Sequence, residues 1–175
     1  METSALASMM ASPRVGHLNA VYHMFAFLKV KHNGVMVFNP TEPDIDTSQF
    51  HREDWSASAY GECKEEIPAN APKSRGLGFT MRAFVDSDHA GDTVTRRSRT
   101  GFLIFLNSAP IYWYSKKQGS VETSSFGAEF IAMKQCCEYI RGLRYKLRMM
   151  GIPVDLPTCV FGDNQSVLAN TSHPH

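Results

Sequence analysis

The sequence lacks the features of a membrane or secreted protein. None of its 175 residues lie in an apolar run as long as a membrane span, and the Met-rich N-terminus has no basic segment before a long apolar core. The four cysteines form no C-x-x-C pair and suggest no disulfide framework, so reduced thiols in the cytosol or nucleus are expected. Cys136 and Cys137 fall within a predicted helix and are expected to be buried apolar residues there.

No strong charge bias and no phosphate-binding loop are present either. The formal net charge is +1, which by itself implies no nucleic-acid partner. Residues 76–79 (Gly-Leu-Gly-Phe) are too short for a phosphate loop and lack the Lys-Ser/Thr that completes one. The hydrophobic share of 43% and the charged share of 20% are ordinary for a globular protein. Residues 81–175 nevertheless carry 11 basic against 8 acidic side chains, so this half is mildly basic.

The N-terminal part predicts a helix followed by a long connection. Ser12-Pro13 is a helix start, apolar residues recur at helical spacing to about Lys31, and residues 35–38 predict a short strand. Residues 39–80 are different in character, because the stretch 42–66 holds eight acidic and two basic residues with prolines on either side. We expect this acidic connection to be weakly structured.

Residues 81–175 predict a mixed α/β domain. Segments 82–87, 101–106 and 110–114 predict three strands of an antiparallel meander. A long helix follows from about residue 124 to residue 150, then a strand at 158–161 and a short helix at 165–170. The expected apolar stripe of the long helix is Phe126, Phe130, Met133, Cys137, Ile140 and Leu147. Its expected solvent face carries Arg141, Arg144, Lys146 and Arg148.

Three carboxylates at the ends of these elements are the candidate site. Asp86 ends the first strand, Asp163 follows the last strand, and Glu129 lies early in the long helix. If the first and last strands pair in parallel, all three converge, and their repulsion requires a cation. Hard oxygen ligands suit Mg²⁺ or Mn²⁺, two of which can drive phosphodiester hydrolysis. The alternative is that each acidic residue serves a turn, a cap or the helix dipole.

Two nearby acidic residues, Asp88 and Asp92, are weaker candidates. A calcium loop built on Asp86, Asp88 and Asp92 fails, because Arg96 and Arg97 stand where later oxygen ligands are needed. We therefore expect Asp88 to be a turn residue.

The chain from Arg82 to His173 resembles the ribonuclease H domain of copia-type retrotransposon Pol polyproteins. Several separate motifs occur in the order of that family, which makes the resemblance specific. The matching stretches are residues 85–91 (VDSDHAG), 96–98 (RRS), 100–101 (TG), 113–118 (WYSKKQ), 124–125 (SS), 128–132 (AEFIA) and 163–166 (DNQS). Residues 11–20 and the helix after them are similar to the end of the preceding reverse transcriptase. The resemblance thus implies three parts: a reverse transcriptase remnant (1–38), the acidic connection (39–80) and a ribonuclease H-like domain (81–175), incomplete at its C-terminus.

The resemblance also implies a function. Asp86, Glu129 and Asp163 become three of the family's four acidic ligands for Mg²⁺ or Mn²⁺, and the reaction is hydrolysis of the RNA strand of RNA–DNA hybrids during reverse transcription. The implied partners are the hybrid, the reverse transcriptase and other parts of the same polyprotein, with no membrane and a cytoplasmic location that includes virus-like particles. The implied phosphate-contacting residues are Arg96, Arg97, Arg99, Lys116 and Lys117. The alternative for these cations is a solvated sheet edge that discourages strand pairing.

The sequence also departs from the family. His89 stands where a tryptophan is usual, and Phe126-Gly127 replaces a usual Thr-Glu. The family's fourth carboxylate belongs to a segment beyond the last residue of this sequence, and the polymerase Asp-Asp motif is absent. The resemblance with these departures leaves two hypotheses, of which the first is an active nuclease. The alternative is an inactive retroelement fragment that keeps the fold and at most binds nucleic acid.

Overall fold

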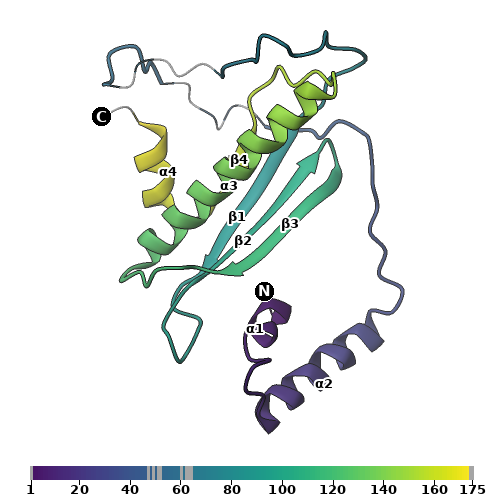
Figure 1. Ribbon diagram of the computed structural model, residues 1–175, viewed down its shortest axis with the longest axis vertical. Coiled ribbons are helices and arrows are strands. Elements are labelled where there is room, and N and C mark those ends of the chain that lie inside the picture. Colours follow the sequence, from purple (N-terminus) through teal and green to yellow (C-terminus); the bar gives the residue numbers. More distant parts are fainter. Residues whose placement is uncertain are drawn as a thin grey trace.

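Four strands form one mixed sheet, and a long helix packs across it (Figure 1). The computed structural model describes residues 2–46, 48, 50, 53–59, 61 and 65–173. The elements in chain order are α1 (Glu2–Ala7), α2 (Val15–Val30), β1 (Met81–Asp88), β2 (Arg99–Leu106), β3 (Ala109–Lys117), α3 (Ser125–Met149), β4 (Cys159–Phe161) and α4 (Gln165–Ser172). The predicted mixed α/β class is confirmed, and the arrangement is consistent with a ribonuclease H-like fold.

The strand order is β3-β2-β1-β4, with β1 in the interior of the sheet. Pairing of β1 with β2 and of β2 with β3 is antiparallel, as the meander prediction required. β4 pairs with β1 in parallel, with Arg82 opposite Cys159 and Phe84 opposite Phe161. The prediction that the first and last strands lie side by side in parallel is therefore confirmed.

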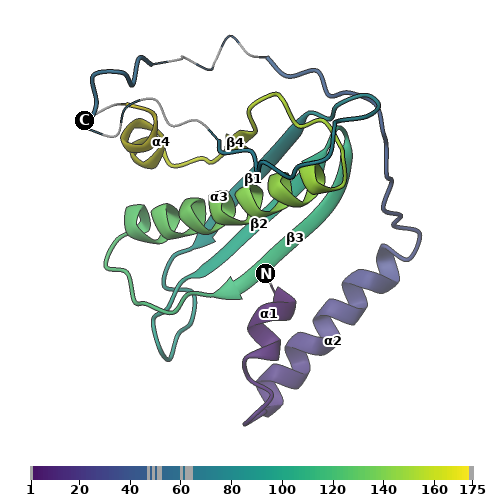
Figure 2. The same cartoon turned by 45° about the horizontal axis from the view of Figure 1, so that its top comes forward.

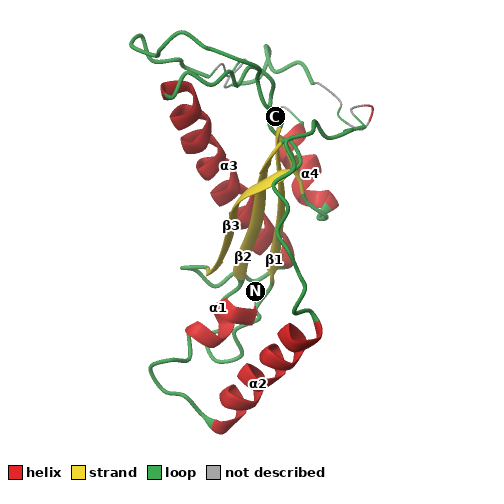
Figure 3. Cartoon of the chain, turned by 90° about the vertical axis from the view of Figure 1, so that its right-hand side faces the viewer, coloured by secondary structure: helices red, strands yellow, loops and turns green. Residues whose placement is uncertain are grey.

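The core lies between α3 and the face of the sheet that α3 covers (Figures 2 and 3). Alternate residues of β1 point to this face, because side chains along a strand alternate between its two sides. The main sheet residues in this core are Met81, Ala83, Val85, Phe102 and Ile104. The long helix begins with a capped end, since the Ser124 hydroxyl accepts the Gly127 N–H.

The buried stripe of α3 differs from the prediction. Ala128, Ala132 and Cys136 are fully buried, whereas Phe130 is 41% exposed and Cys137 is exposed. The small residues recur at every fourth position and let the helix approach the sheet closely, so the bulky Phe130 lies to one side. The expectation of burial is confirmed for Cys136 and wrong for Cys137, and Cys63 lies outside the described residues.

Arg144 is the second correction on this helix, because it is buried rather than on the solvent face. Its guanidinium donates to both carboxylate oxygens of Glu65, to the carbonyl oxygens of Val154 and Leu156, and to the Thr158 hydroxyl. A planar guanidinium has five N–H donors, so it can donate to several acceptors at once. Arg144 thereby joins the acidic connection to the loop that leads into β4.

The acidic connection is also anchored near its beginning. Asn39 forms an isolated bridge with Ser108, and the Asn107 side chain donates to the Pro40 carbonyl and accepts the Thr80 N–H. These bonds bring both ends of the connection to the turn between β2 and β3. The strand predicted for residues 35–38 is absent, since these residues pair with no strand.

The N-terminal helices stand apart from the core (Figures 1 and 2). α2 confirms the predicted helix but buries none of its residues, and among the helices and strands it contacts only the unpredicted α1. Phe25 and Tyr22 are 64% and 63% exposed. Among the described residues, no helix has the length and hydropathy needed to cross a membrane.

The anchor at Glu65 generates a pH-dependent prediction. The Arg148 guanidinium, together with Arg144, lowers the pKa of the Glu65 carboxyl from 4.5 to about 2. Stabilisation from this carboxylate is complete above pH 4.5 and is lost as the pH falls toward 2. Glu65→Gln should therefore cost about 1 kcal/mol at pH 7, a modest value because the side chain is 36% exposed.

Urea unfolding at several pH values checks this. The difference from the wild type should shrink steadily between pH 4.5 and pH 2. Glu66→Gln, which neutralises the exposed neighbouring carboxylate, is the matched control and should change the unfolding free energy little. A Glu65→Gln variant as stable as the control at pH 7 would contradict the anchoring role.

Candidate metal centre and nucleic-acid interface

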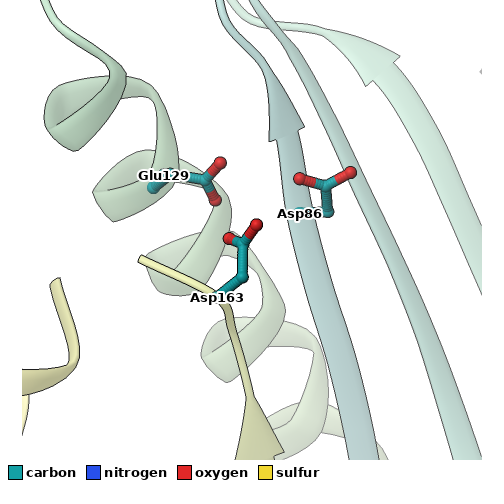
Figure 4. A group of neighbouring side chains, drawn as sticks. All are labelled: Asp86, Glu129 and Asp163. Atoms are coloured by element: carbon teal, nitrogen blue, oxygen red, sulfur yellow. The ribbon is translucent and has the colours of Figure 1, made fainter. Parts of the chain in front are cut away.

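Asp86, Glu129 and Asp163 form one cluster (Figure 4). One carboxylate oxygen from each residue lies within 4.8 Å of those of the other two. Asp86 comes from β1, Glu129 from the second turn of α3, and Asp163 from the segment just after β4. Asp86 and Asp163 are exposed and Glu129 is half-buried. The predicted convergence of the three carboxylates is present in the structure.

Parallel pairing and close packing produce this geometry. β1 and β4 run in the same direction, so both aspartates emerge at the carboxyl-end edge of the sheet. Gly162 lets the chain after β4 lie against the core, because a Cβ there would be 3.3 Å from Met133 Cε. The next residue, Asn164, caps α4 by accepting the Val167 N–H, which directs the chain away after Asp163.

Negative charge is concentrated at the cluster of three carboxylates. Burial first, and then the negative charges of Asp86 and Asp163, raise the pKa of the Glu129 carboxyl. The Ser87 backbone N–H, 3.2 Å from Glu129 Oε1, opposes that rise and holds the carboxylate toward β1. Among the described residues, none of the three carboxylates forms an ion pair with a basic side chain.

The donor set fits a divalent cation. Three carboxylates that repel one another are stabilised together only when a positive charge lies between them. Oxygen donors with two exposed members leave positions for water or phosphate oxygens, as Mg²⁺ and Mn²⁺ require. Within the part of the chain that the structure describes, no other group of three His, Cys, Asp or Glu side chains is this close together.

Basic residues lie at the same edge of the sheet. β3 runs in the direction of β1, because each is antiparallel to β2, so Lys116 and Lys117 end β3 near the end of β1. The loop from β1 to β2 carries Arg96, which is exposed, and Arg97, which is half-buried. β3 is two strands from β1, so the backbone at Lys116 lies about 10 Å across the sheet from the end of the strand that carries Asp86.

Arg99 does not join this basic surface. It is only 3% exposed, and its guanidinium donates to the hydroxyls of Ser4 and Ser8 at 2.9 and 3.0 Å. A side chain enclosed in this way has no surface to present to a phosphate. Its position does not support the predicted phosphate contact and assigns Arg99 instead to the docking of the N-terminal segment beside β3.

Asp92 is the residue that the sequence reasoning underrated. It is 5% exposed and accepts the Lys117 ammonium at 2.9 Å, so one of the predicted phosphate-binding lysines is partly engaged. It also accepts the N–H groups of Val94 and Thr95. An aspartate followed by a turn-forming segment is the sequence signal that could have found this role.

A separate cavity of about 390 Å³ lies between α3 and strands β2 and β3. Its wall includes Tyr112 and Tyr139, and burial raises the pKa of Tyr112 to about 12. None of the three clustered carboxylates lines it. The carboxylate cluster and the cavity are therefore distinct features.

Fold and cluster together define an α/β module with a candidate divalent-cation site, and sequence comparison relates it to known proteins. The chain is similar to the retrovirus-related Pol polyprotein from transposon RE2 of Arabidopsis thaliana, with 32% identity over 90 residues. The match covers 51% of this chain and 6% of that polyprotein. The Pol polyprotein from transposon TNT 1-94 of Nicotiana tabacum is 32% identical over 88 residues, covering 50% and 7% of the two chains.

A third relative is an uncharacterized mitochondrial protein of Arabidopsis thaliana, 49% identical over 55 residues, which are 31% of this chain and 23% of the relative. No family model and no solved structure matches the chain. Over about half of its length the chain is thus similar to retrotransposon Pol polyproteins, of which it spans a small fraction. These similarities support a retrotransposon-derived module.

The cluster generates a metal-binding prediction. Mg²⁺ or Mn²⁺ should raise the melting temperature of the wild type, because a cation held by the folded state alone stabilises it by about 2.7 kcal/mol at one hundred times Kd. Asp86→Asn should lose most of that rise. In EDTA the same variant should melt no lower than the wild type, since it removes repulsion around Glu129.

Thermal melts with and without the cation check this prediction. Asp88→Asn is the matched control, because it removes an equal charge from the same strand outside the cluster, and it should keep the full rise. An equal rise in Asp86→Asn and the wild type would place the cation elsewhere.

Proposed function

We propose that the chain is a retrotransposon-derived ribonuclease H module that hydrolyses the RNA strand of RNA–DNA hybrids. The observation that carries the proposal is the convergence of Asp86, Glu129 and Asp163, whose carboxylate oxygens lie within 4.8 Å of one another. The similarity of about half the chain to retrotransposon Pol polyproteins adds a context in which such hybrids arise.

In this proposal the three carboxylates hold Mg²⁺ or Mn²⁺ at the carboxyl-end edge of the sheet. A pair of such ions, when bound, supplies an activated water and stabilises the leaving oxygen of a phosphodiester. Asp86 extends from an interior strand, and its carboxylate lies within 4.8 Å of those of the other two ligands. The Ser87 N–H keeps Glu129 oriented toward Asp86.

The basic residues would hold the substrate beside this centre. Exposed Arg96 and Lys116, with half-buried Arg97, can contact phosphates on the hybrid backbone. Such contacts position a duplex without reading its sequence, which suits an enzyme that degrades hybrids of any sequence. Recognition of the RNA strand would depend on groups that reach its 2′-hydroxyls.

Other parts of the same polyprotein, the reverse transcriptase above all, are the proposed protein partners. The exposed apolar side chains of α2 support this, because single helices that bury nothing need a covering partner. Apolar residues also stay exposed in the segment after α2, where Val35 is 81% exposed.

Cleavage of a labelled RNA–DNA hybrid tests the nuclease function. The wild type with Mg²⁺ or Mn²⁺ should shorten the RNA strand and leave a DNA duplex of the same sequence intact. Asp86→Asn, Glu129→Gln and Asp163→Asn should each reduce the rate at least about 100-fold, because each removes a charge that holds the ions.

Asp155→Asn is the control for charge. Asp155 is exposed in the loop before β4, at the opposite end of that strand from Asp163, and its variant should cleave at the wild-type rate. Binding of the hybrid without any cleavage would refute the enzyme and identify a nucleic-acid-binding module that keeps the fold.

A further inference from the structure

The loop from β1 to β2, residues 89–98, is built around one buried acidic residue, Asp92. Its side chain is 3% exposed, although the loop itself lies at the surface. An aspartate is rarely enclosed to this degree unless its charge is paired and its oxygens accept hydrogen bonds. Both conditions are met here, which makes Asp92 the organising residue of the loop.

Asp92 bonds the loop through side chain and backbone alike. Its Oδ1 accepts the N–H groups of Val94 and Thr95 at 3.1 and 2.8 Å, and its Oδ2 accepts Lys117 Nζ at 2.9 Å. Its own N–H donates to the Arg97 carbonyl, and its carbonyl accepts the Arg96 N–H at 2.7 Å. These bonds include the backbone of both candidate phosphate-binding arginines.

The conformation of the loop needs such support. Arg96 has a φ of 56° and Ala90 a φ of 52°. Both values lie in the left-handed region, which residues other than glycine rarely adopt. Between them, Gly91 leaves room for the Asp88 carboxylate, which a Cβ at this position would displace. Ser98, fully buried, accepts the Ala90 N–H and holds the other end.

The loop lies at the same edge of the sheet as the candidate metal centre. It emerges from the edge at which Asp86 lies, and the ion pair ties it to the last residue of β3. Exposed Arg96 is thus presented at the carboxylate edge by a turn that Asp92 holds closed. Lys117 is the partner of Asp92 in this ion pair, so its charge is not wholly available to a phosphate.

We propose that Asp92 is a positioning residue for nucleic-acid binding, which holds Arg96 and Arg97 in the arrangement that contacts the phosphates of an RNA–DNA hybrid. This rests on the proposed function, which it deepens by naming the residue that shapes the substrate-binding surface. Asp92 touches no substrate itself and acts only through the loop.

The affinity of Asp92→Asn for the hybrid should change in the direction opposite to that expected from net charge alone. Removal of a negative charge near a polyanion-binding surface ordinarily strengthens binding. Asp92→Asn should instead weaken hybrid binding about tenfold, because loss of the Lys117 ion pair frees the loop from β3, and the loop then no longer orders the two arginines. The slope of log K against log salt should also become shallower by about 1 to 2, as expected when one or two phosphate contacts are lost.

Fluorescence anisotropy of a labelled RNA–DNA hybrid in EDTA, from 50 to 200 mM salt, measures this without cleavage. Asp88→Asn is the matched control: it removes an equal charge at the end of β1, and it should bind as well as the wild type or better. Four proteins are compared: the wild type, Asp92→Asn, the double variant Arg96→Gly/Arg97→Ala, and the triple variant that combines all three substitutions. Glycine is used at position 96 because it keeps the left-handed turn.

The triple variant should bind no more weakly than Arg96→Gly/Arg97→Ala, since Asp92 acts through those side chains. Additive losses, or an Asp92→Asn variant that binds as tightly as the wild type, would overturn the proposal. If Asp92→Asn does not fold, Asp92→Ser serves instead, because its hydroxyl can still accept a loop N–H group while the ion pair that ties the loop to Lys117 is lost. Wild-type or tighter binding by Asp92→Ser would also overturn it.

The result of this binding test can be distinguished from the result of the cleavage test. Hybrid binding with the expected variant pattern but without cleavage would refute the enzyme and support the role of Asp92. Cleavage by the wild type together with unchanged binding of Asp92→Asn would do the reverse. A wild-type chain that does not bind the hybrid would overturn both.

Discussion

The parallel pairing of β1 with β4 is the constraint on which the candidate site depends. It involves few residues, from Arg82 opposite Cys159 to Phe84 opposite Phe161, yet it places Asp163 beside Asp86 at one edge of the sheet. The connection from β3 to β4 is α3, and its small buried residues bring Glu129 over the same edge. One strand pairing and one helix packing therefore assemble three carboxylates that are far apart along the chain.

This arrangement separates charges of opposite sign along a single edge. The carboxylates lie at the ends of β1 and β4, and the cations lie on the loop after β1 and at the end of β3. A carboxylate cluster beside a basic surface is a combination suited to phosphodiester chemistry. Asp92 connects the two, because it is an acidic residue whose bonds shape the basic surface.

Individual polar anchors fix the N-terminal segment and the acidic connection to the rest of the chain. Glu65 is fastened to Arg144 and Arg148, Asn107 holds Pro40 and Thr80, and Arg99 binds Ser4 and Ser8. Each anchor joins residues far apart in the sequence. Buried arginines serve well here, because a guanidinium can satisfy several acceptors at once.

The sequence by itself determined the order of the main elements and the three carboxylates of the site. Alternating apolar residues, a capped helix start and turn residues are local signals, so they are readable without any tertiary contact. Together with the family resemblance, they were enough to place Asp86, Glu129 and Asp163 on adjacent elements. The antiparallel meander followed the same signals, whereas parallel pairing of the first and last strands entered the sequence argument as a condition, which the structure meets.

Only the tertiary structure decided which charged residues are exposed. Arg144 and Arg99 occur in polar stretches, and nothing local shows that Glu65 or the hydroxyls of Ser4 and Ser8 will enclose them. The same holds for Asp92, whose partner Lys117 lies 25 positions away. The physical reason is that burial of a charge depends on a partner brought by the fold, whereas a helix or strand depends mainly on its own neighbours.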